Sequence, residues 1–348
     1  MKTKKGRILD ALFVLFLACL VLLGAGCRKP RSGGADLEEA QSYCLVASWG
    51  SHGTGDGELN GPTGLAVDRL GNVYVLDAGN YRVQKFHSSE RFLAKWGSEG
   101  SANGQFGKGE IGPVGPKGIA VDRYANVYVG DTGNHRVQKF DSSGEFLLKW
   151  GSIGTGDGQF LQPEAVAVDS SGGVYAADTF NHRIQKFDSS GNFILKWGSL
   201  GSRDGEFSYP AGIATETSGN VYVVDHDLDT SGYKVQKFDG SGRFLGKWEA
   251  LRPPLEYGLI GLPPSVGVDP SGGIYVTGFL IGTPSNPTST YYFRKFDSMG
   301  KRLLLEWSSA GPEGEEFRYP TGVAFDSSGN LYVADQLKDS IQKFQPHH

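Results

Sequence analysis

The chain has 348 residues, of which 52 are glycine and 12% are aromatic, and its formal net charge at pH 7 is −4. This acidic balance argues against nucleic-acid binding, which depends on a basic surface. Abundant glycine together with many aromatic residues is typical of short strands joined by tight turns.

Residues 1–26 have the organisation of an export signal. Lys2, Lys4, Lys5 and Arg7 form a basic start, and residues 11–26 are an almost unbroken apolar run. That run is short for a membrane span, which needs roughly 20 apolar residues. A signal peptide therefore fits it better.

The run ends in LLGAGC, which resembles a bacterial lipoprotein signal with Cys27 as the lipidated first residue of the mature protein. Gly24 departs from the usual branched apolar residue, so ordinary cleavage and an uncleaved anchor remain alternatives. Removal of residues 1–26, which hold four Lys/Arg and one Asp, leaves 30 basic and 37 acidic residues, a net charge of −7. We expect an exported protein of the cell envelope whose only membrane attachment is this N-terminal lipid or anchor. A soluble periplasmic or secreted protein is the alternative.

Residues 27–42 are polar and rich in charge and glycine, which predicts a flexible tether. Cys19 lies in the signal and Cys27 at its end, so Cys44 is the one cysteine within the predicted fold. We therefore expect no disulfide framework.

A repeat organises residues 43–346. The stretch 131–151, DTGNHRVQKFDSSGEFLLKWG, recurs closely at 77–97 and 178–198, and looser copies follow. The Phe of the (V/I)QKF core marks six copies at intervals of 47 to 58 residues: Phe86, Phe140, Phe187, Phe238, Phe296 and Phe344. A period of about 50 residues that is rich in strand formers predicts the blades of a β-propeller.

Each copy divides into four predicted strands. In the first copy these are PTGLAVD (62–68), NVYV (72–75), the VQKF core and a fourth strand that ends at a Trp. The sixth copy stops after Phe344 without a fourth strand, whereas an additional strand-like segment, 44–49, precedes the first copy. We expect that segment to complete the last blade and close the ring, because closure leaves no open sheet edge. The predicted fold is an all-β, six-bladed propeller of four-stranded antiparallel blades in one domain.

The sequence after the second strand resembles the NHL-repeat family of β-propellers. Asp131, Asn134, His135 and Arg136 match its motif, as do their counterparts at 178–183. Blade one has Tyr81 in place of the His, and blades four to six keep the strands but lack the Asn-His-Arg. The resemblance implies the fold and leaves the function open, because propellers host unrelated activities.

The repeated polar residues of this motif are interpreted as structural. A residue that chemistry needs once does not have to recur in several blades, whereas a side chain that shapes a turn does. We expect the Asp residues to bond nearby backbone and the Arg residues to pair with carboxylates: Asp77, Asp131, Asp178, Arg82, Arg136 and Arg183. His135 and His182 alternate with Tyr81 at one position, which favours a packing role.

The up-and-down order of the strands places the variable loops on one face, because successive connections in a blade alternate between its two faces. The turns after the first and third strands are short and similar in all copies, whereas the loops after the second and fourth strands are long. The largest insertions are 226–233 in blade four and 279–292 in blade five. Variable loops on a rigid scaffold are the usual location of binding.

The best candidate binding position follows the proline that begins each first strand. It should lie at the mouth of the central channel, on the face of the long loops, and reads Thr63, Lys117, Glu164, Ala211, Ser265 and Thr321. Lys117 and Glu164 come from neighbouring blades and are the strongest candidates. The alternative is that these side chains are merely solvated, since exposed charges are ordinary.

A second candidate is a calcium loop in blade four. Asp225, Asp227 and Asp229 stand at alternate positions, as oxygen ligands do in calcium-binding loops. The glycine falls two places late, and Gln236 stands where a bidentate Glu is expected. A solvated acidic loop is the alternative, and no other cofactor is predicted.

Together these features predict a binding scaffold for a protein, peptide or glycan partner in the cell envelope. No nucleophile elbow, phosphate loop or Cys/His metal cluster is present in the sequence, so no catalytic residue is assigned. The alternative is a metal-dependent hydrolase or lyase with its site at the channel mouth.

Overall fold

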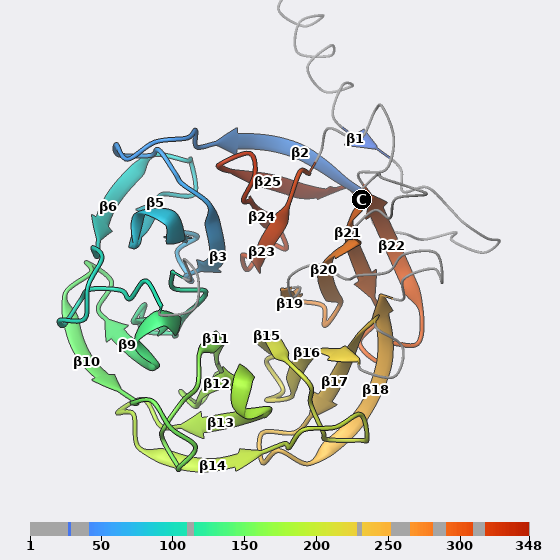
Figure 1. Cartoon of the computed structure of the whole chain (residues 1–348). Coiled ribbons are helices and arrows are strands. Elements are labelled where there is room, and N and C mark those ends of the chain that lie inside the picture. The colour runs from blue at the N-terminus through green and yellow to red at the C-terminus, as the bar shows by residue number, and fades with distance from the viewer. Residues whose placement is uncertain are drawn as a thin grey trace, which may run out of the picture.

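The computed structural model describes residues 27–28, 42–109, 115–227, 232–251, 265–280, 290–308 and 317–347. Figure 1 looks along the axis of a ring of six antiparallel sheets, with the first strand of each blade near the axis and the fourth at the outer edge. The predicted six-bladed, all-β propeller is confirmed. The predicted signal, residues 1–26, and most of the tether lie outside the described residues. Among the described residues, no helix is both long and apolar enough to cross a membrane.

The strands follow the repeat. Blade one holds β3 (Pro62–Val67), β4 (Val73–Asp77), β5 (Arg82–Phe86) and β6 (Phe92–Trp96). Blade two holds β7 (Gly118–Val121), β8 (Val127–Asp131), β9 (Arg136–Phe140) and β10 (Phe146–Trp150). Blade three holds β11 (Pro163–Val168), β12 (Val174–Asp178), β13 (Arg183–Phe187) and β14 (Phe193–Trp197). Blade four holds β15 (Pro210–Thr215), β16 (Val221–Asp227), β17 (Gly232–Phe238) and β18 (Phe244–Leu251). Blade five holds β19 (Val266–Val268), β20 (Ile274–Leu280), β21 (Thr290–Phe296) and β22 (Leu303–Ser308).

Blade six closes the ring by joining the two ends of the chain. Its strands are β23 (Pro320–Phe325), β24 (Leu331–Asp335), β25 (Ser340–His347) and the N-terminal β2 (Ser42–Trp49). β2 pairs antiparallel with β25, so that Leu45 lies opposite Phe344 and Trp49 opposite Ile341. The predicted closure by residues 44–49 is confirmed.

A short strand, β1 (Cys27–Arg28), adds a fifth strand to blade six. The backbone register places Cys27 opposite Cys44 and Arg28 opposite Tyr43. Cys44 is disulfide-bonded, so the expectation of a fold without disulfides was wrong. That expectation treated residues 27–42 as a tether, whereas the first two of these residues pair with β2.

The second strand of each blade is apolar on both sides because a neighbouring blade covers each side. In β4, Tyr74 packs in a cluster with residues of blade two, and Val73 and Val75 pack in a cluster with residues of blade six.

At the outer edge, Trp96 contacts Phe140 of the next blade. Gly144 adopts a φ of +93°, and a Cβ there would come within 2.5 Å of the Trp96 ring, so this turn requires glycine.

The ring has two different faces. On the loop face, each first strand begins and each second strand ends; there Pro62 lies opposite Asp77. On the turn face lie the short turns after the first and third strands. On the loop face, blades one to three carry 3₁₀ turns: η1 (Ala78–Asn80), η2 (Thr132–Asn134) and η3 (Thr179–Asn181). Blades four and five instead extend the hairpins β16–β17 and β20–β21, whose tips, 228–231 and 281–289, lie outside the described residues.

Candidate functional site at the channel mouth

The motif Asp and Arg residues hold the loops of the loop face in place. The buried Asp77 carboxylate accepts hydrogen bonds from the Asn60 backbone N–H at 2.7 Å and from Arg82 Nε at 2.7 Å. The Arg82 guanidinium also donates to the carbonyl oxygens of Thr54, Gly55 and Glu58. Blades two and three repeat the Asp–Arg pair at the same distance. The structural interpretation of these residues is confirmed.

The side chains of the motif histidines also contact backbone groups. His135 and His182 adopt left-handed conformations, with φ of 54° and 55°, and Tyr81 has a φ of 53°. His135 Nδ1 accepts a hydrogen bond from the Gln162 N–H at 3.1 Å, and His182 Nδ1 lies against the Ser208 carbonyl oxygen. Both rings therefore position the loop that leads to the next blade, as the packing interpretation expects.

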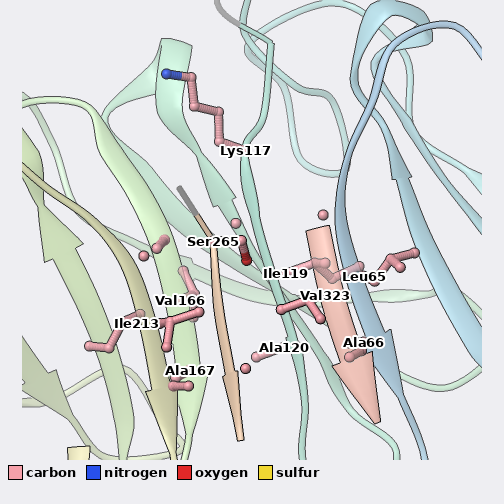
Figure 2. A pocket seen from close by; sticks show the side chains of 18 of the residues that line it. Leu65, Ala66, Lys117, Ile119, Ala120, Val166, Ala167, Ile213, Ser265 and Val323 are labelled. Carbon is pink, nitrogen blue, oxygen red and sulfur yellow. The ribbon is translucent and has the colours of Figure 1, made fainter. Parts of the chain in front are cut away.

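The predicted channel-mouth residues come together around one cavity of about 310 Å³. All six positions that follow a first-strand proline line it: Thr63, Lys117, Glu164, Ala211, Ser265 and Thr321. Figure 2 shows Lys117 at one end, with Leu65, Ile119, Val166, Ile213 and Val323 along the walls. The cavity thus combines an aliphatic channel with a polar mouth.

One ion pair distinguishes the mouth. Lys117 Nζ lies 2.5 Å from Glu164 Oε1, and this pair links blades two and three. The Glu164 side chain is only 8% exposed and that of Lys117 is 26% exposed. Among the described residues that line the cavity, these two alone are charged. An ammonium has three donors and a carboxylate two oxygens, so the pair keeps hydrogen-bonding capacity for a ligand.

The threonine hydroxyl groups at the mouth form hydrogen bonds that link neighbouring blades. Thr63 Oγ1 donates to the Pro116 carbonyl oxygen at 3.2 Å, and Thr321 Oγ1 donates to that of Pro62 at 2.8 Å. Each bond ties a blade to the next at the start of its first strand. The Ser265 N–H donates to Thr277 Oγ1 at 2.9 Å within blade five. The ion pair is therefore the element of the mouth best suited to select a ligand.

Sequence reasoning missed two residues of the mouth, Tyr319 and Gln336. Tyr319 precedes the first-strand proline of blade six, and its ring lies 5.5 Å from that of Tyr291. Burial raises the pKa of Tyr319 to about 12, so it stays protonated and can donate a hydrogen bond. Its place directly before Pro320 was the signal that could have revealed it.

Only part of the predicted calcium loop lies within the described residues. Asp225 is fully buried and accepts hydrogen bonds from the N–H groups of Ser208 and Tyr209 at 2.9 and 2.8 Å. It occupies in blade four the place that Asp77 has in blade one. The Asp227 side chain and Asp229 lie outside the described part. Within that part, no group of three or more His, Cys, Asp or Glu residues is arranged to hold a metal ion. The calcium loop stays a prediction.

Comparison with known proteins agrees with this architecture. The family model for the NHL repeat matches residues 59–86, 114–140, 160–187 and 317–344, in blades one, two, three and six. The chain is therefore a β-propeller of six blades. More particularly, it is a propeller in which these four blades carry NHL repeats.

Curated relatives match over short segments. The chain is 32% identical to NHL repeat-containing protein 3 of Homo sapiens over 103 residues, which are 29% of this chain and 28% of that protein. It is 28% identical to Protein brain tumor of Drosophila melanogaster over 114 residues, 32% of this chain and 10% of that protein. The match thus spans less than a third of the length of either relative.

Solved structures share the fold at low identity. A protein of unknown function from Bacteroides thetaiotaomicron has a TM-score of 0.59 at 20% identity, covering 88% of this chain and 76% of its own. A gluconolactonase from Xanthomonas campestris has a TM-score of 0.57 at 14% identity, covering 92% and 96%. A virginiamycin B lyase from Staphylococcus aureus has a TM-score of 0.54 at 14% identity, covering 87% and 99%. At these identities the likeness concerns the fold alone.

Proposed function

We propose that the protein is an exported binding scaffold that holds a protein, peptide or glycan partner of the cell envelope on its loop face. The observation that carries this proposal is the channel-mouth cavity, which is walled by aliphatic side chains and has one largely buried ion pair, Lys117–Glu164, at its mouth. Concave, mostly apolar sites with a few placed polar groups are the usual form of ligand pockets.

Among the three partner classes, the chemistry of the cavity favours a peptide. An apolar side chain can enter between Leu65, Ile119 and Val166, where burial of its surface is favourable. The Glu164 carboxylate and the Lys117 ammonium can then bond the N–H and C=O groups that flank this side chain. A glycan would match the mouth but not the aliphatic walls.

The test is a swap of the ion pair. The double variant Lys117→Glu with Glu164→Lys keeps a pair between blades two and three but reverses its direction. The exposed pair Lys196–Asp157, also 2.5 Å long and on the outer part of blade three, provides the matched control. The purified mature chain is screened on peptide and glycan arrays, and the best ligand is titrated against the parent, Lys117→Glu/Glu164→Lys and Lys196→Asp/Asp157→Lys.

We expect a peptide ligand whose affinity falls at least tenfold in the channel-mouth swap, about 1.4 kcal/mol of binding free energy, and is unchanged in the control swap. A glycan as the best ligand would correct the partner class. Equal affinity of all three proteins would place the site elsewhere, and binding to neither array would contradict the scaffold proposal.

A second candidate is a metal-dependent hydrolase or lyase at the same cavity. It is favoured by the fold that the chain shares with a gluconolactonase and a virginiamycin B lyase, and by the Glu164 carboxylate at the mouth. Elemental analysis of the purified chain, paired with a lactone-hydrolysis assay, separates the candidates. Stoichiometric metal and turnover that are both lost in Glu164→Gln would favour the enzyme.

A further inference from the structure

The turns between the first and second strands contain two exposed positions directly after the acid that begins the turn. In blade one, Asp68 Oδ1 accepts hydrogen bonds from the N–H groups of Leu70 and Asn72. In blade three, Asp169 Oδ1 does the same for Ser171 and Gly173. The acid therefore shapes the turn, and the side chains of the two residues that follow it are exposed.

Four blades use small or polar residues at these two positions: Ser170-Ser171, Thr217-Ser218, Pro270-Ser271 and Ser327-Ser328. The neighbouring blades one and two instead carry Arg69-Leu70 and Arg123-Tyr124. All six turns share one backbone hydrogen bond, from the N–H of the fourth residue to the carbonyl oxygen of the acid. Turn geometry therefore does not require the arginine or the apolar side chain. Arg123 also donates to the Ser170 carbonyl oxygen of blade three at 3.4 Å, but this bond does not explain the exposed apolar side chain that follows each arginine.

The apolar side chains of this pair of turns are strongly exposed. Leu70 is 83% exposed and Tyr124 is 70% exposed, the two highest values among the large hydrophobic residues that the structure describes. Arg123 Nη2 donates to Tyr124 Oη at 2.8 Å, and its guanidinium lies 4.8 Å from the centre of the ring. We refer to Arg69, Leu70, Arg123 and Tyr124 as the Arg–apolar patch.

The charge of the patch is positive although the chain is acidic. Asp68 and Asp122, the acids that begin the two turns, are buried and occupied by hydrogen bonds within their turns. The exposed charges at the tips of the turns are therefore those of the two arginines. An apolar surface flanked by arginine suits an anionic lipid surface, because arginine binds phosphate and tyrosine favours the interface.

The N-terminus enters the ring on the same face. Phe325 lies opposite Leu331 at the turn-face end of blade six, and Leu331 lies opposite Phe344. β2 and β25 continue beyond that end to the pairs Cys44–Gln345 and Ser42–His347. β1 pairs with this extension at Cys44 and Tyr43. Residues 27 and 28, which directly follow the predicted signal, thus lie toward the turn face.

We propose that the Arg–apolar patch is a contact site for anionic lipid headgroups and seats the turn face of the propeller on the membrane. The two arginines bind phosphate groups, while Leu70 and Tyr124 enter the boundary between headgroups and acyl chains. The loop face and the channel mouth then point away from the lipid, toward a partner. Only this last consequence rests on the proposed binding function.

The test measures membrane affinity without the N-terminal anchor. The mature chain with Cys27→Ser is sedimented with vesicles of phosphatidylcholine alone and of phosphatidylcholine mixed with phosphatidylglycerol, at low salt. The patch variants are Leu70→Ser/Tyr124→Ser and Arg69→Ser/Arg123→Ser, which install the residues that blade three carries. Ile194→Ser, which changes an exposed residue on the outer strand β14, is the control. Melting curves verify that each variant is folded.

We expect the parent and Ile194→Ser to bind vesicles with phosphatidylglycerol several-fold more strongly than phosphatidylcholine vesicles. Leu70→Ser/Tyr124→Ser should reduce binding to both vesicle types, and Arg69→Ser/Arg123→Ser should abolish the preference for phosphatidylglycerol. Absence of vesicle binding by the parent, or binding unchanged in both patch variants, would overturn the proposal. The best array ligand should bind every variant equally, so failure here and failure of the proposed function are separate results.

Discussion

The Asp–Arg pair shows how one substitution changes the electrostatics of a blade. In blades one to three, the Arg Nε lies 2.7 Å from the carboxylate, and the guanidinium also reaches three carbonyl oxygens. Blade four has Lys234 instead, whose Nζ lies 3.5 Å from Asp225 Oδ2. A lysine cannot reproduce the planar fork of an arginine. Burial raises the pKa of Asp225 from 3.8 to about 7, which Lys234 only partly opposes.

This shift predicts a specific dependence of stability on pH. Because the pKa of Asp225 is higher in the folded state, the folded state binds more protons between about pH 4 and 7, and the free energy of unfolding falls as the pH rises through that range. Lys234→Arg should lower this pKa and reduce the fall in the free energy of unfolding with pH. In urea unfolding, the variant should have a free energy of unfolding about 1 kcal/mol above that of the parent at the upper end of the range, and a smaller gain at the lower end. A pH slope identical to that of the parent would contradict the assignment.

Among the described elements, β2 matters most to the whole ring, because this N-terminal strand pairs with the C-terminal β25 within one blade. Tyr43 Oη lies 2.8 Å from Tyr275 Oη of blade five. At the other end of β2, the Trp49 ring contacts Phe86 of blade one and Tyr332 of blade six. One strand thus touches three blades.

Loss of β2 should therefore destabilise the entire propeller. Deletion of residues 42–49 exposes the edge of β25 and is expected to abolish cooperative melting. The point variant Trp49→Ala should cost about 3 kcal/mol, in the usual range for a large aromatic side chain, whereas the more exposed Leu45→Ala in the same strand should cost less than about 0.5 kcal/mol. Thermal melting checks both, and a truncated chain that melts like the parent would refute closure through β2.

For the whole molecule, the chemistry at residue 27 decides between the proposed membrane anchor and its soluble alternative. Cys44 is disulfide-bonded, and its backbone partner across the ladder is Cys27. A cysteine sulfur that carries a lipid thioether cannot also form a disulfide. With only Cys19, Cys27 and Cys44 in the chain, a lipidated mature protein would leave Cys44 without a cysteine of its own chain.

The proposed lipid anchor predicts that Cys27→Ser moves the protein from the membrane fraction to the soluble fraction of its producing cell. If Cys27 carries a lipid, the intact mass of the parent includes that lipid and Cys44 labels as a reduced thiol under denaturing conditions. A mass without lipid and no reactive thiol would instead establish the disulfide and the soluble alternative. Retention of Cys27→Ser in membranes would indicate an uncleaved apolar anchor.

The sequence by itself determined the ring: six copies of a four-strand pattern, the segment that completes the last blade, and the six positions around the channel mouth. These features were predictable because a repeat makes each blade a copy of one local pattern, and strand alternation then orients every side chain. The contacts between copies were decided only by the tertiary structure. The 2.5 Å approach of Lys117 to Glu164, the place of Tyr319 at the mouth, and the pairing of β1 with β2 depend on how separate blades and chain ends meet in space. No local pattern specifies those distances, because they follow from the angle and register between strands far apart in the chain.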